Sequence, residues 1–259
     1  MSSEVPSPAG TDDSADGVGV TLWWAPLDVP ASSLRSLAEC LSPEEARRAD
    51  ELRRHVDRER FVAARGWQRR LIAAELGCDP REVPIVIGVG GKPTVQGSNL
   101  RFSAARSASL ALYATSWWTD VGVDIEAIRK DAAIEDIARR FFSPAEQLGL
   151  ASLSPPRRLT ASFQCWTAKE AYAKGIGSGL TFPLQSIDTW RADGRPVTVS
   201  GWMIHQVDVG IEYAAAVAGR GLEGWVPAVP RRVGSPNSGP STGTIERSSE
   251  GVLGGLLEE

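Results

Sequence analysis

The chain of 259 residues has only three cysteines and two histidines, which excludes or disfavours several common kinds of site. Its three cysteines, Cys40, Cys78 and Cys165, lie far apart and outside any CxxC pattern, which argues against a disulfide frame or a zinc site and predicts reduced, mostly buried thiols. His55 and His205 are the only histidines, so an HExxH site is excluded and a Ser-His-Asp triad would need one of these two. No apolar run approaches the roughly 20 residues that span a bilayer, and the N-terminus lacks the basic start and apolar stretch of a signal peptide. We therefore expect a cytoplasmic protein.

Net charge is small, and the acidic excess belongs to the two ends of the chain. The whole sequence carries −4, whereas residues 1–21 carry −4, residues 221–259 carry −2, and residues 22–220 carry +2. This basic excess is far too weak for a nucleic-acid-binding face, but it suits a small anionic ligand. Both ends are rich in Gly, Pro and Ser, and we expect them to be disordered tails, the first of them acidic. Neither nucleic acid nor a membrane is an expected partner.

Between the tails, helical and strand patterns alternate. Ser-Pro-x-Glu sequences begin at Ser42 and Ser143, and each predicts a helix N-terminus with a capping box. The expected helices cover residues 44–60, 61–76, 134–141 and 160–176. The expected strands cover residues 22–25, 84–89, 100–102, 110–115, 121–125, 187–190, 196–199, 202–205 and 213–218. Each half thus offers helices and several short strands, which predicts an α+β fold with an N-terminal lobe at 22–118 and a C-terminal lobe at 119–220.

The first chemical motif is VGVDIE at residues 121–126. On a strand, side chains at i and i+2 point the same way, so Asp124 and Glu126 project together. Two carboxylates in that arrangement repel each other unless a cation lies between them, and a hard cation such as Mg²⁺ prefers oxygen ligands. The alternative is a strand end with two solvated acidic residues, and this motif alone does not decide between the two.

The second motif is WTAKEAYAKGIGSGL at residues 166–180. On a helix, Trp166, Glu170 and Lys174 lie at i, i+4 and i+8, which is one face, and Lys169 lies one position away. Such a stripe could supply a third metal ligand and a cation for a phosphate. Taken alone, a Glu–Lys pair on a helix surface is the simpler interpretation.

The two motifs together are much more specific. They resemble the 4′-phosphopantetheinyl transferases of the two-lobed, surfactin-synthetase-activating type, in which GVD-x-E is followed by W-x-x-KE-x-x-x-K. ARRFFSPAE and TFPLQSI also match the family, as do GKP (residues 91–93) and the helix RERFVAARGWQRRLIAAELG, so the resemblance covers roughly residues 22–220. It implies two lobes related by pseudo-twofold symmetry, each a small, mostly antiparallel sheet packed with helices.

The resemblance also implies a reaction and its residues. The 4′-phosphopantetheine arm of coenzyme A would move to a serine of an acyl or peptidyl carrier protein of polyketide or nonribosomal peptide biosynthesis, releasing 3′,5′-ADP. Asp124, Glu126 and Glu170 would hold Mg²⁺, with Mn²⁺ as an alternative, and Glu170 would take the serine proton. Lys174 would neutralise the attacked phosphate. Lys92 of GKP would lie near the nucleotide phosphates. We expect a monomer.

One segment departs from the family pattern. Where the family has FN-x-SHS, this chain has Ser103 for the asparagine, Ala105 for the first serine and Arg106 for the histidine. The family histidine helps to bind the 3′-phosphate of coenzyme A, and an arginine, with a permanent charge and a bidentate fork, suits the same task. Otherwise Arg106 is an ordinary surface arginine. Arg47 and Arg48 stand where the family has basic residues for this phosphate, although by themselves they resemble solvated helix charges.

Two other functions use the same residues. A non-catalytic relative would bind coenzyme A or a carrier protein without transfer, having lost activity when the FN-x-SHS segment changed. A Mg²⁺-dependent hydrolase would cleave a nucleotide pyrophosphate with water as the acceptor. Turnover separates the first from a transferase, and product analysis without any carrier protein separates the second.

Overall fold

The structure, a computed structural model, describes residues 19–130, 133–222 and 225–233. Most of the two expected tails therefore lies outside the described residues. All three cysteines are described and free, with Cys40 and Cys165 buried and Cys78 partly exposed. Among the described helices, none is both long and apolar enough to cross a membrane.

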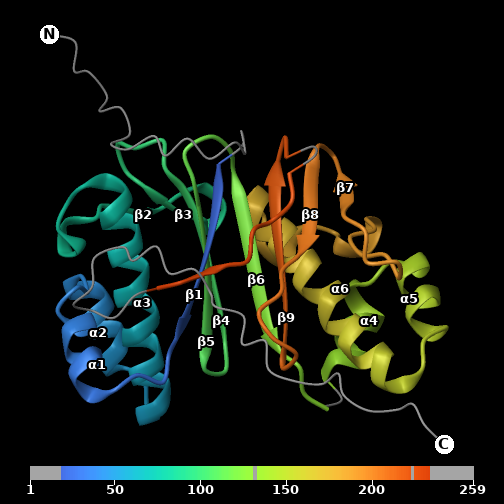
Figure 1. Cartoon of the computed structure of the whole chain (residues 1–259), viewed down its shortest axis with the longest axis horizontal. Helices are drawn as coiled ribbons and strands as arrows, with labels where there is room; N and C mark the ends of the chain where they lie inside the picture. Colours follow the sequence, from blue (N-terminus) through green and yellow to red (C-terminus); the bar gives the residue numbers. More distant parts are fainter. Residues whose placement is uncertain (1–18, 131–132, 223–224, 234–259) are drawn as a thin grey trace, which may run out of the picture.

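The first lobe contains one mostly antiparallel sheet, a short hairpin and three helices, which lie at the left of Figure 1. In chain order its elements are β1 (Val20–Pro26), α1 (Ala31–Ala38), α2 (Pro43–Asp50), α3 (His55–Leu76), β2 (Ile85–Ile87), β3 (Pro93–Val95), β4 (Arg101–Ser107) and β5 (Leu110–Ser116). β5 is paired with β1 on one side and β4 on the other, antiparallel to both. The long helix α3 packs against the strands and also contacts α1 and α2.

The second lobe has a similar composition and lies at the right of Figure 1, with its strands next to those of the first lobe. In chain order its elements are β6 (Val121–Ala127), α4 (Ala133–Phe141), α5 (Pro144–Ala151), α6 (Pro155–Ile176), β7 (Val197–Val199), β8 (Trp202–Gln206) and β9 (Tyr213–Arg220). Its sheet has the order β6-β9-β8-β7, and all neighbours in it are antiparallel. The expected α+β fold of two small, mostly antiparallel lobes is confirmed.

A repeated capping motif shows how alike the lobes are. Ser42 and Ser143 each cap a short helix, α2 and α5, and the glutamate three residues later completes a capping box in both. α3 and α6 are both 22 residues long, and each ends at a glycine in the left-handed conformation, Gly77 and Gly177. A left-handed residue there satisfies carbonyls of the last turn, and both helices end where the sequence predicted, at residues 76 and 176.

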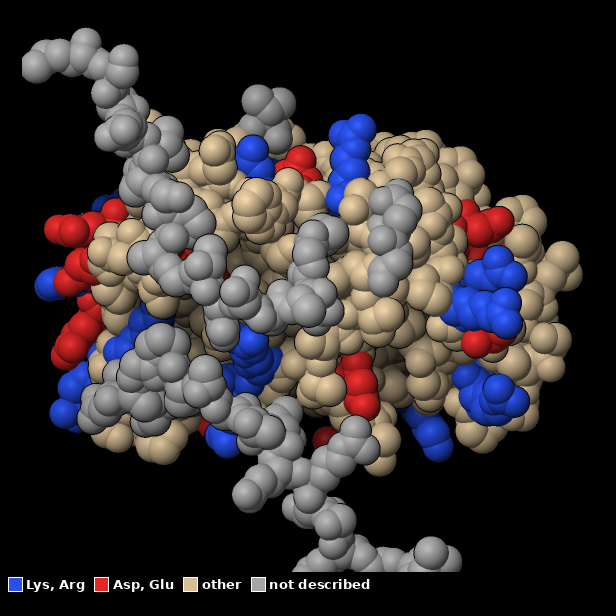
Figure 2. Space-filling view, turned by 45° about the horizontal axis from the view of Figure 1, so that its top comes forward, with Lys and Arg blue, Asp and Glu red and all other residues tan. Residues whose placement is uncertain are grey.

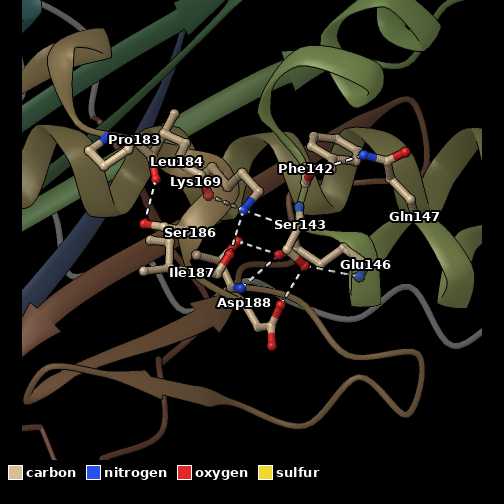
Figure 3. A network of polar contacts seen from close by, with 11 residues as sticks. Phe142, Ser143, Glu146, Gln147, Lys169, Pro183, Leu184, Ser186, Ile187 and Asp188 are labelled. Carbon is tan, nitrogen blue, oxygen red and sulfur yellow. Dashed lines mark hydrogen bonds and ion pairs between the residues drawn. The ribbon is translucent and has the colours of Figure 1, made fainter.

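Each long helix also carries one buried cation that binds the capping glutamate. In the first lobe Arg69 Nε donates to Glu45 at 2.5 Å, and in the second lobe Lys169 Nζ lies 2.8 Å from Glu146. Both cations also donate to backbone carbonyls beyond their helix, Arg69 to that of Pro80 and Lys169 to that of Leu184. Figure 3 shows the second of these networks, in which Lys169 and Glu146 point toward each other between α5, α6 and the following loop. The short helix, the long helix and the segment after it are thus joined in the same way in both lobes.

The lobes meet where β4 lies beside β6. Ser103 Oγ accepts a hydrogen bond from the backbone N–H of Val123, and Ser107 Oγ accepts one from that of Ala127, both at 3.0 Å. Side chains of the two sheets also form one continuous apolar cluster, to which both lobes contribute buried valines, leucines and alanines. The contact between the lobes is therefore a packed core with serine hydrogen bonds at its edge.

Part of the expected C-terminal tail is structured. Leu222 is fully buried, and strand β10 (Arg231–Arg232) pairs in parallel with β1 of the first lobe. The Arg231 guanidinium lies 5.7 Å from the ring centroid of Trp23, and that of Arg232 lies 5.4 Å from the ring of Trp24. Cation–π contacts and strand pairing thus give this segment partners that its composition did not predict. We keep residues 22–118 and 119–220 as the proposed lobes.

Several expected elements differ in extent or type, and for three of them the cause is local. The helix expected over 44–60 is interrupted at 51–54, which lets α2 fold back onto α3. The helix expected from residue 160 already begins at Pro155, a favourable residue for the first turn. No strand forms over 187–190, because the backbone there serves the buried pair: the carbonyl of Ile187 accepts from Lys169, and the N–H of Thr189 donates to Glu146.

Candidate functional site

Strand β6 and helix α6, which carry the two motifs, are in close backbone contact. A Cβ atom on Gly122 of β6 would lie 2.0 Å from the carbonyl oxygen of Ala171 and 2.3 Å from the nitrogen of Gly175, both in α6. Only glycine permits this approach, which explains the glycine of VGVDIE. The contact brings Asp124, two residues further along β6, next to the end of α6.

The geometry predicts that alanine at Gly122 is costly. Because its Cβ would strike backbone atoms that cannot rotate away, we expect Gly122→Ala to lower the free energy of unfolding by about 1–3 kcal/mol. Gly149→Ala is the matched control, since Gly149 lies inside α5 and its Cβ would meet only the Trp190 ring, at 3.5 Å. Thermal melting of both variants checks this: equal melting temperatures would show that β6 and α6 do not need the close contact.

Asp124 and Lys174 form the centre of the site. Lys174 Nζ donates to Asp124 Oδ1 at 2.6 Å. Asp124 is only 5% exposed, and its second oxygen, Oδ2, is buried without a hydrogen-bond partner in the structure. Burial raises the pKa of Asp124 to about 7, although Lys174 acts in the opposite direction. A buried carboxylate oxygen without a partner is costly, so this atom is poised to accept a ligand.

The other two predicted carboxylates lie near Asp124. Glu126 and Glu170 both raise the pKa of Asp124 by charge repulsion, and burial raises the pKa of Glu170 itself. Glu126 Oε2 accepts a hydrogen bond from Ser107 Oγ at 2.7 Å, so the same serine that binds the β6 backbone orients this carboxylate. The structure thus brings the three predicted acidic residues into one electrostatic cluster.

The donor set of this cluster fits a hard cation. It offers only carboxylate oxygens, and one of them, Asp124 Oδ2, has no partner. Within the described residues, however, no three His, Cys, Asp or Glu side chains stand ready to enclose a metal by themselves. Mg²⁺ commonly binds through one or two carboxylates and completes its shell with water and substrate phosphates. Asp124, Glu126 and Glu170 are therefore suitable ligands for an ion that arrives with a phosphate.

Lys92 also lies at the C-terminal end of α6. Its Nζ donates to the carbonyl of Gly175 at 2.6 Å and lies 3.7 Å from Asp120 Oδ1. Burial lowers the pKa of Lys92. A Cβ on Gly90, which has a φ of +79°, would lie 2.2 Å from the carbonyl of Gly177. The glycine-rich loop before Lys92 therefore packs on the C-terminal end of α6.

Two cavities lie between the long helices. The first, of about 230 Å³, is lined by the Gly90–Pro93 loop, Phe102 and the end of α6. The second, of about 310 Å³, is lined by the predicted Arg106 and by Tyr113, among others. Both cavities share four lining residues: Arg65, Gln68, Ala104 and Lys174. Lys174 thus contacts the carboxylate cluster and borders both cavities.

The structure does not bring every predicted residue to these cavities. Lys92 lines the first and Arg106 the second, where Arg106 is exposed and makes no hydrogen bond or ion pair with another described residue. Arg47 and Arg48 are exposed on α2 and line neither cavity, and Arg48 Nη1 donates to Glu51 at 2.7 Å. Their part in phosphate binding stays a prediction.

Several lining residues of α3 were not singled out from the sequence. Arg65 and Gln68 line both cavities, and Phe61 lines the second. Phe61, Arg65 and Gln68 stand at i, i+4 and i+7, which is one helical face. A glutamine and an arginine on a helix face that also holds apolar residues are a detectable signal, but the basic character of the whole helix obscures it.

Comparison with known proteins gives a consistent set of relatives. The sequence profile of the 4′-phosphopantetheinyl transferase superfamily matches residues 120–228. The 4′-phosphopantetheinyl transferase HetI of Nostoc sp. is 35% identical over 215 residues, which is 80% of this chain and 90% of the relative. A 4′-phosphopantetheinyl transferase of Bacillus subtilis is 29% identical over 51% of this chain and 58% of its own length. The similarity to HetI extends over both lobes.

Proposed function

Because the chain belongs to the 4′-phosphopantetheinyl transferase superfamily, we propose that it transfers the 4′-phosphopantetheine arm of coenzyme A to a serine of an acyl or peptidyl carrier protein. The product would be the holo carrier, with release of 3′,5′-ADP. The observation that supports this most directly is the Asp124–Lys174 pair, in which a buried carboxylate with one unpartnered oxygen binds an ammonium group that lines two cavities between the lobes. Such a junction suits a ligand with several phosphates.

The proposed step replaces the phosphoanhydride bond of the donor with a phosphate ester bond to serine. The serine oxygen bonds to the phosphorus of the phosphopantetheine phosphate, and the bond from that phosphorus to the bridging oxygen of the pyrophosphate breaks. The serine proton passes to the carboxylate of Glu170. Burial raises the pKa of Glu170, and a carboxylate with a higher pKa is a stronger base. The Lys174 ammonium group would lie beside the attacked phosphate and stabilise the developing negative charge.

We assign the metal ligands to Asp124, Glu126 and Glu170. Bound Mg²⁺, or Mn²⁺ in its place, would supply a Lewis acid and a template for the pyrophosphate. Asp124 would contribute the free Oδ2, while Ser107 holds Glu126 in orientation. Lys92 and Arg106 would hold nucleotide phosphates, as would Arg47 and Arg48 if α2 approaches the bound donor.

The proposal includes a carrier protein that is acidic and a transferase that works as a cytoplasmic monomer. Free cysteines, two of them buried, agree with a reducing compartment. On the face in Figure 2, Lys and Arg lie interspersed with Asp and Glu, and uncharged residues occupy much of the surface. On this face, electrostatic attraction of the carrier would therefore come from local groups rather than from one broad basic field.

A carrier assay tests the function. We expect purified protein with Mg²⁺ and coenzyme A to raise the mass of an apo carrier domain by one phosphopantetheine, with 3′,5′-ADP formed in equal amount. Mass spectrometry of the carrier and chromatography of the nucleotide measure the two products. Binding of coenzyme A without any mass change, across several carriers, would favour the non-catalytic relative. Cleavage of coenzyme A without a carrier would favour the hydrolase.

A further inference from the structure

Gln68 is a buried polar side chain that has no role in the mechanism proposed above. It stands on α3, is 3% exposed, and lines both cavities between the lobes. Its Nε2 atom is buried and has no hydrogen-bond partner in the structure. Most buried polar atoms in proteins have a partner, so an unpaired amide at a cavity wall indicates that a ligand supplies the acceptor.

Arg65 determines which way the amide of Gln68 points. Arg65 Nη1 donates to Gln68 Oε1 at 2.7 Å. A guanidinium group only donates hydrogen bonds, so the amide oxygen must face Arg65 and the NH₂ group must face away from it. The guanidinium is itself held over the ring of Phe61, 5.7 Å from its centroid. The donor of Gln68 is therefore held in a fixed direction before any ligand arrives.

The second cavity has the charge that a phosphate requires. Arg65, Arg106 and Lys174 line it, and no aspartate or glutamate is among its lining residues. Three cations around a space of about 310 Å³ attract an anion, and arginine guanidinium groups match the geometry of phosphate oxygens. The amide N–H of Gln68 adds a hydrogen-bond donor. A phosphate oxygen can accept this hydrogen bond, whereas a bound cation could not.

We infer that Gln68 and Arg65 are binding residues for a phosphate monoester of the donor, namely the 3′-phosphate of coenzyme A. This inference rests on the proposed function. Coenzyme A carries two anionic groups, the pyrophosphate and the 3′-phosphate. The pyrophosphate belongs at Lys174 and the carboxylate cluster. The 3′-phosphate is then left for Arg65 and Arg106, the other cations of the second cavity. Gln68 Nε2 donates to one phosphate oxygen, and Arg65 and Arg106 pair with the others. Hydrogen-bond donors from α3 thus bind the phosphate together with the altered segment at residues 103–106.

Comparison of two donors tests this role. Coenzyme A and 3′-dephospho-coenzyme A differ only in the inferred ligand group. In the carrier assay, Gln68→Leu removes the amide at similar volume, and we expect kcat/KM for coenzyme A to fall about ten- to hundred-fold, the usual effect of losing a hydrogen bond to a charged group. For 3′-dephospho-coenzyme A the value should change less than about two-fold. Gln68→Glu keeps the acceptor for Arg65 and should reduce activity with coenzyme A further.

Matched variants and a binding measurement separate this inference from the proposed function. Arg65→Met should also reduce the preference for coenzyme A, whereas Arg58→Met, exposed on the same helix and outside both cavities, should not. In calorimetric titrations, wild-type protein should bind 3′,5′-ADP more tightly than 5′-ADP, and Gln68→Leu should lose that difference. Equal losses with both donors, or an unchanged preference for 3′,5′-ADP, would overturn the inference. Failure of the wild type to modify any carrier would instead contradict the proposed function, and the titrations would still report on Gln68.

Discussion

Asp124→Asn should reduce transfer by about a hundred- to thousand-fold while making the protein more stable at pH 8. The loss of activity follows because the variant lacks the charge that pairs with Lys174 and the oxygen assigned to the metal. The gain in stability follows because the native carboxylate is almost fully buried and has one oxygen without a partner. An amide of the same shape carries no charge to desolvate, so its burial costs less.

The pH dependence gives this prediction a definite sign. The pKa of Asp124 is about 7 in the folded protein, against 3.8 for an unperturbed aspartate. The folded state therefore holds this proton more tightly than the unfolded state, and its stability falls as the pH rises from about 4 to 7. Asp124→Asn lacks this group, so the difference between the two proteins should be small near pH 4 and reach a few kcal/mol, about 4 at most, at pH 8.

Urea denaturation at pH 4.5, 6 and 8, combined with the carrier assay, measures both effects. Asp120→Asn is a suitable control, since Asp120 is half exposed beside Lys92 and belongs to neither the carboxylate cluster nor the cavity walls. A variant at Asp124 that is less stable than wild type at pH 8 would show that the Lys174 ion pair outweighs the desolvation. Retained activity would remove Asp124 from the proposed site.

The local sequence was sufficient to predict the strand and the helix that hold the site residues, but only some of the residues that line the cavities. Alternation in VGVDIE and helical spacing in WTAKEAYAK predicted that Asp124 and Lys174 stand on a strand and a helix, and the structure places both there. Capping boxes predicted where α2 and α5 begin because such signals act within one turn. The close contact of β6 with α6 depends on atoms about fifty residues apart, and only the glycine at 122 gave any hint of it.

Contacts made at long range escaped prediction for the same reason. The role of Arg65 and Gln68 depends on cavities whose other walls come from β4, β5, α6 and the loop at residues 90–93. Strand β10 pairs with β1, although the surrounding composition is typical of a flexible tail. Ile187–Trp190 has the apolar pattern of a strand, yet its backbone groups bind Lys169 and Glu146 instead. In each case the local pattern is compatible with more than one structure, and a contact with residues distant in sequence determines which one forms.

Lys169 illustrates how a motif residue can act through the fold rather than through the substrate. Its side chain is 0% exposed, and its Nζ lies 2.8 Å from Glu146 and donates to the carbonyls of Leu184 and Ile187, also at 2.8 Å. Glu146 in turn accepts from the backbone N–H groups of Ser143 and Thr189. This network, seen in Figure 3, joins α5, the loop after α6 and the helix that carries Glu170.

Lys169→Met should therefore lower the free energy of unfolding by about 3–5 kcal/mol, because it leaves the Glu146 charge buried without its cation. Arg69→Met should have an effect of the same kind in the first lobe, where Arg69 binds Glu45 in the equivalent position. Arg191→Met is the exposed control, since its ion pair with Asp193 is largely solvated and should contribute less than about 1 kcal/mol. Urea titrations with an unchanged m-value measure all three. A loss at Lys169 no larger than that at Arg191 would show that water or rearrangement compensates Glu146, and that the pair does not hold α6 in place.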